Sequence, residues 1–130
     1  MQQFLLFQLA WVFLGSLIGA LMLRPLAARL AAKQISFGSA YLTLVIAGVI
    51  HAIIAAIVFL TFTHAQRPPL QLMAALHITN FLIVSGVIGY RHQLPFRTGL
   101  RITLFMLLIV LAVAAVITIG VLLWMRVFIS

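Results

Sequence analysis

The chain has 130 residues, of which 66% are hydrophobic, and its mean hydropathy is +1.34. Soluble domains are only about half apolar, so this composition indicates a membrane protein. Lysine and arginine total 8 whereas aspartate and glutamate total 0, which excludes side-chain carboxylates as general acids or bases, hard-cation ligands and proton carriers.

The first predicted membrane span covers about residues 4–23. A stretch of about 20 apolar residues crosses a bilayer core, and no basic side chain precedes this one, so we expect a retained helix and not a signal peptide. Gly15 and Gly19 form a GxxxG pattern on it. Small residues at this spacing let a second helix backbone approach closely, so the pattern predicts a packing face.

Residues 24–34 carry three basic side chains, Arg24, Arg29 and Lys33. Pro25 suits the first turn of a helix, so we expect a separate, short amphipathic helix in the lipid headgroup region. Its long basic side chains would reach lipid phosphates.

The second predicted span, residues 35–63, has no formally charged residue and carries His51 near its middle. Gly48 and Ala52 are four residues apart and predict a smooth packing face. The third span, residues 70–90, follows a tandem proline that ends one helix and lets another begin.

The polar residues of the third span include His77, Thr79, Asn80 and Ser85. A basic turn then leads to the fourth span, residues 99–125, and this turn and the start of the span contribute Arg91, Arg97 and Arg101. All six basic residues beside the first and third loops are expected to contact anionic lipid phosphate, and only Arg67 and Arg126 lie on the other side. The positive-inside rule therefore places loops 1 and 3 in the cytoplasm of a bacterial inner membrane, with both termini outside.

A weak internal repeat relates the two predicted hairpins. Gln34-Ile35-Ser36-Phe37 enters the second span, and Gln93-Leu94-Pro95-Phe96 enters the fourth. Two hairpins of the same orientation would be related by an axis along the membrane normal.

His51 and His77 are the candidate chemical residues, because an ionisable group inside a span is a functional hypothesis by default. Two imidazoles from neighbouring helices could ligate a haem iron, or one could ligate the magnesium of a chlorophyll-type pigment. The alternative, which we favour, is a neutral histidine that packs inside the bundle, with His51 bonded to Asn80 or to another subunit. A further alternative is a small oligomeric channel or transporter with a pore lined by His77, Asn80 and Ser85.

The sequence predicts an all-α, polytopic membrane protein with four transmembrane helices, arranged as two hairpins in one domain of residues 1–130. We expect a structural or accessory subunit of a larger membrane complex, whose partners are anionic lipids and other membrane subunits. No catalytic motif, metal-spaced histidine pair or cysteine occurs, so we expect no enzyme activity, bound metal or cofactor. Nucleic acid is not expected either, because no basic soluble module is present.

Overall fold

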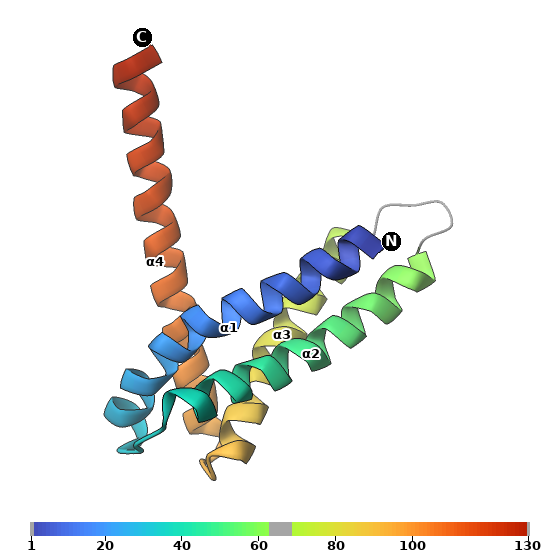
Figure 1. Cartoon of the computed structure of the whole chain (residues 1–130), viewed down its shortest axis with the longest axis vertical. Helices are drawn as coiled ribbons and strands as arrows, with labels where there is room; N and C mark the ends of the chain where they lie inside the picture. Colours follow the sequence, from blue (N-terminus) through green and yellow to red (C-terminus); the bar gives the residue numbers. More distant parts are fainter. Residues whose placement is uncertain (1, 63–68, 130) are drawn as a thin grey trace.

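A computed structural model describes residues 2–62 and 69–129, and this part of the chain is entirely helical, with no strand (Figure 1). The helices are α1 (Gln2–Ala31), α2 (Phe37–Phe62), α3 (Leu70–Arg91) and α4 (Phe96–Ile129). Each of the four is long and apolar enough to cross a membrane. The predicted fold class is confirmed, and the chain is a multi-pass membrane protein.

Helix α1 continues through Pro25 to Ala31, so the predicted break after residue 23 and the separate connector helix are absent. Proline removes one backbone hydrogen bond from a helix and favours a break. However, Leu23 and Ala27 on either side of Pro25 are both 0% exposed and belong to the same core cluster. Packing of these two side chains holds one continuous helix where the local sequence favours two.

The starts of α2 and α4 share one backbone hydrogen bond: Ala40 donates to the carbonyl of Ser36 at 3.0 Å, and Gly99 donates to the carbonyl of Pro95. Ser36 precedes α2, and its hydroxyl accepts a hydrogen bond from the backbone N–H of Ser39 at 3.2 Å, as a helix N-cap does. Pro95 precedes α4, and its carbonyl accepts the N–H groups of Thr98 and Gly99 at 2.9 and 3.1 Å. The two similar tetrapeptides thus occupy the same place before a helix, while the duplication they suggest stays a prediction.

Each helix contacts two neighbours: α1 packs against α2 and α4, and α3 packs against the same two helices. The core lies at the end where α1 and α3 finish and α2 and α4 begin, and it includes Leu23, Ile35, Ile88 and Ile102. Figure 1 shows α1, α2 and α3 running side by side, whereas α4 leaves them after its first turns. All residues from 107 to 129 are consequently exposed.

The closest helix–helix approach joins α3 and α4. A Cβ atom added at Gly99 would collide with the carbonyl oxygen of Ser85, and one added at Gly89 would lie 3.1 Å from the carbonyl oxygen of Leu94. Neither obstacle is a flexible side chain that can move aside. Glycine at position 99 is therefore required for α4 to lie against α3.

We predict that Gly99→Ala lowers the free energy of unfolding by about 1–3 kcal/mol, because the added methyl group forces two backbones apart. Gly120→Ala is the matched control, since nothing lies within 4 Å of the Cβ position on the same helix. Thermal unfolding in detergent measures both. Equal midpoints for the two variants would contradict the close approach.

Candidate functional site

A groove with a volume of about 700 Å³ opens between α1 and α3 beside the point where α4 leaves the bundle. Helix α2 also lines it, and α1 does not contact α3 in the described ranges. The groove collects every candidate packing and cofactor residue of the spans: Gly15, Gly19, Gly48, His51, Ala52, His77 and Asn80.

The glycines of the groove have different surroundings. A Cβ atom on Gly19 would lie 2.6 Å from Cδ1 of Leu44, and one on Gly48 would lie 2.7 Å from Cγ1 of Val12. These two glycines therefore lie where α1 and α2 pack. Nothing lies within 4 Å of the Cβ position of Gly15, which faces the open groove.

His51 is half-buried, and its Nδ1 atom is buried without a hydrogen-bond partner in the part of the chain that the structure describes. The expected bond from Asn80 therefore does not form at this atom, and a partner from another subunit stays a prediction. His77 is exposed on α3 and near enough to His51 for the two imidazoles to interact electrostatically. A buried polar atom without a partner is costly in an apolar medium, so a polar group that enters the groove and bonds to Nδ1 of His51 would be stabilising.

The described residues contain no group of three or more His, Cys, Asp or Glu side chains able to hold a metal ion. His51 and His77 together are the residues that could ligate a haem iron, and this use of the pair stays a prediction. Ser85, the third residue of the alternative pore, does not line the groove, and the pore itself stays a prediction. Ser85 is 0% exposed, and its hydroxyl donates to the carbonyl of Phe81 at 2.7 Å.

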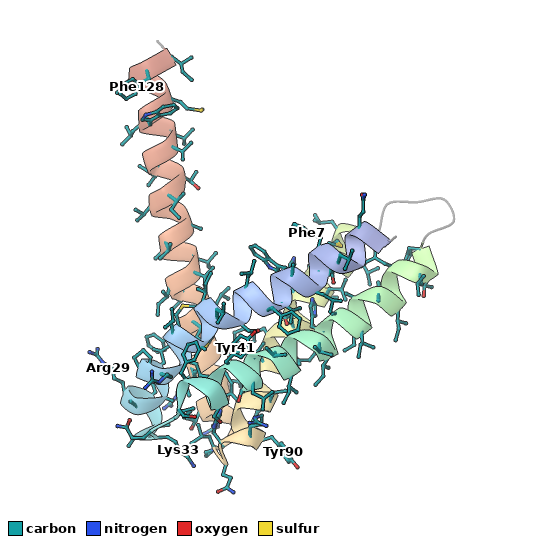
Figure 2. The ribbon with its side chains drawn as sticks, in the orientation of Figure 1. Phe7, Arg29, Lys33, Tyr41, Tyr90 and Phe128 are labelled. Atoms are coloured by element: carbon teal, nitrogen blue, oxygen red, sulfur yellow. The ribbon has the colours of Figure 1, made fainter. Side chains whose placement is uncertain are left out.

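Six basic residues lie at the end where the core lies, as Figure 2 shows for two of them, Arg29 and Lys33. The six are Arg24, Arg29, Lys33, Arg91, Arg97 and Arg101. Two arginines are anchored by their Nε–H groups: Arg24 donates to the carbonyl of Ile35, and Arg91 donates to Oγ1 of Thr43, each at 3.1 Å. Arg29, Arg97 and Arg101 are exposed, and no intrachain hydrogen bond anchors these three side chains among the described residues.

Thr43 is the centre of a buried network that joins α2 to the end of α3. Its hydroxyl donates to the carbonyl of Ser39 at 2.7 Å, lies 2.9 Å from Nε2 of His92 and accepts from Arg91. A hydroxyl has one hydrogen and two acceptor sites. Because the Thr43 hydroxyl donates its one hydrogen to the carbonyl of Ser39, the Nε2 atom of His92 must carry a hydrogen and donate it to Thr43.

His92 is 6% exposed, although it lies in the short turn between α3 and α4. Its burial depends on the contact with Thr43, 49 residues earlier, which no local pattern indicates. Burial lowers the pKa of His92 below its ordinary value of 6.5, and the charges of Arg91 and Lys33 lower that pKa further. Burial and the two nearby positive charges therefore favour the neutral imidazole.

A scan against protein-family models finds no matching family, and comparisons with curated proteins and with solved structures find no match. The class is defined by the structure alone: a four-helix, multi-pass membrane protein with an open groove in its apolar region and a basic end.

We predict that acid destabilises the fold through His92. The pKa of His92 is lower in the folded chain than in the unfolded chain, so the folded chain binds the imidazole proton more weakly. The contribution of the neutral His92 to stability is therefore complete above about pH 6.5, and it is lost as the pH falls through the folded pKa. Thermal midpoints in detergent should fall from about pH 7.5 to about pH 5. His92→Gln, which keeps a donor for Thr43, should show a smaller fall, and an equal fall in both proteins would contradict the prediction.

Proposed function

We propose that the protein is a structural or accessory subunit of a larger membrane complex, and that α4 is the helix that contacts the partner. The observation that supports this is the exposure of residues 107–129, named here the distal segment of α4. In the most apolar stretch of α4 only 6% of the residues are buried, against 22% in each of the other three helices. This stretch of α4 is thus the most apolar of the four and the least covered.

The distal segment and the groove form one continuous surface, because Leu107 and Val110 of α4 also line the groove. Helix α4 is unbroken from Phe96 to Ile129 and contains no proline, so it does not fold back to fill the groove. A partner helix lying along the distal segment would enter the groove between α1 and α3. Such a helix could bring a polar group to the unpaired Nδ1 of His51, and interhelical hydrogen bonds of this kind add to packing in membranes.

An accessory role without catalysis accords with the chemistry of the side chains. Aspartate, glutamate and cysteine are absent from the sequence, so the commonest acid–base and nucleophilic groups are missing. The basic residues beside loops 1 and 3 contact anionic lipid in this proposal, and they attach the subunit to the membrane surface.

We predict that bulky residues at the small positions of the distal segment release the partner without unfolding the chain. Ala112, Ala115 and Gly120 are all exposed, and nothing lies within 4 Å of the Gly120 Cβ position, so we expect the chain to accommodate Phe at each of them. At least one of the three should lower the amount of partner that co-purifies after mild extraction by about tenfold, which corresponds to a loss of about 1.4 kcal/mol of binding free energy.

Ile53→Phe, at an exposed position of α2, is the control for this series and should leave co-purification unchanged. Thermal midpoints of the isolated variants should match the wild type. Full co-purification of all three α4 variants would contradict the docking role.

The orientation that we propose has both termini on the periplasmic side of a bacterial inner membrane. It is supported by the six basic residues that lie beside loops 1 and 3 at one end of the molecule, since basic loops remain cytoplasmic. We predict that an alkaline phosphatase fused after Ser130 is active, whereas the same enzyme inserted in loop 1 is inactive. The reverse pattern would contradict this orientation.

A further inference from the structure

We propose that Lys33 and Arg91 form a specific site for a phosphate-bearing anion at the junction of loop 1 with the end of α3. This site is narrower than the general attraction of basic loops to an anionic surface, and it does not depend on the partner of α4. The ligand chemistry is a phosphate group, carried by an anionic phospholipid headgroup or free in solution.

The two cations come from different hairpins and lie at the same end of the molecule. Lys33 lies between α1 and α2, Arg91 ends α3, and both are close enough to His92 to lower its pKa. Figure 2 shows Lys33 at the same end of the molecule as Tyr90, the residue before Arg91. Two positive charges are therefore held beside a buried, neutral imidazole.

The Arg91 guanidinium is oriented in advance by the chain itself. Its Nε–H donates to Thr43, which is 0% exposed and is held in turn by the carbonyl of Ser39. The side chain nevertheless remains exposed, so the donors on Nη1 and Nη2 stay available. A guanidinium fork fixed in this way matches the geometry of a phosphate and binds it through two parallel hydrogen bonds.

Nothing in the sequence offers these cations an acidic side chain, because aspartate and glutamate are absent. Like charges held close together destabilise the fold, and an anion bound between them offsets that cost. Arg24 lies nearby in the chain fold, since its Nε–H donates to Ile35, two residues after Lys33. This second anchored guanidinium is placed to extend the site toward α1.

Arg97 provides the matched control. It carries the same charge at the same end of the molecule, and it is exposed on the first turn of α4. No hydrogen bond orients its side chain in the described ranges. If binding depends on an oriented guanidinium, loss of Arg91 weakens it more than loss of Arg97. If binding depends on net charge alone, the two losses are equal.

The test measures binding of dioleoylphosphatidylglycerol and dioleoylphosphatidylcholine to the detergent-purified chain by native mass spectrometry. We expect the wild type to prefer the anionic lipid and Arg91→Gln to weaken its binding about tenfold, as loss of a charge-assisted hydrogen bond does. Arg97→Gln should weaken it much less. Equal losses in the two variants, or no preference for the anionic lipid, would overturn the proposal.

Two further variants separate orientation from charge. Arg91→Lys and Thr43→Val keep every positive charge, and both should still weaken binding, because lysine lacks the fork and valine cannot accept the Nε–H bond. Unchanged binding in Arg91→Lys would overturn the proposal even if Thr43→Val fails to fold.

Inorganic phosphate distinguishes the two sources of the ligand. If millimolar phosphate raises the thermal midpoint of the wild type but not of Arg91→Gln, the site accepts free phosphate. If the anionic lipid raises the thermal midpoint of the wild type and inorganic phosphate does not, the ligand is a lipid headgroup. Either result supports a phosphate site, and a failure of both ligands to stabilise the chain would overturn it.

Discussion

The fold depends on the backbone contact between Gly99 on α4 and Ser85 on α3. Lipid tails are as apolar as leucine, so helices in a membrane are held by close packing and hydrogen bonds rather than by the hydrophobic effect. Both kinds of interaction are concentrated at the basic end of this molecule. There the core around Ile88 and Ile102 adjoins the hydrogen bonds of Thr43, and α4 separates from the other helices beyond it.

The spans and the class of protein were predictable from composition and length, because a helix needs about 20 mostly apolar residues to cross a bilayer. Residues whose role depends on distant contacts were not predictable in the same way. Pro25 indicates a helix break, but packing of its neighbours overrides it. His92 resembles an ordinary loop residue until α2 brings Thr43 beside it. The sequence likewise placed His51 near the middle of a span, but the unpaired Nδ1 could be found only from the surrounding helices.

The two ends of the molecule consequently have different roles in our account. The basic end is closed by a buried network and carries the charges that meet phosphate. The apolar region is open, because α4 leaves the bundle (Figure 1) and every residue of its distal segment is exposed. A largely apolar segment exposed in this way offers packing area to a partner, and the groove beside it adds polar groups that can specify which partner fits.

The central claim is that the distal segment of α4 contacts another membrane protein. Site-specific cross-linking tests it most directly, because the chain contains no cysteine and single cysteines can be introduced from residue 107 to residue 129 without removing any. With a thiol-reactive photo-cross-linker in intact membranes, we expect protein adducts that recur about every 3.6 residues, marking one helix face. Adducts to lipid alone at every position would contradict the claim.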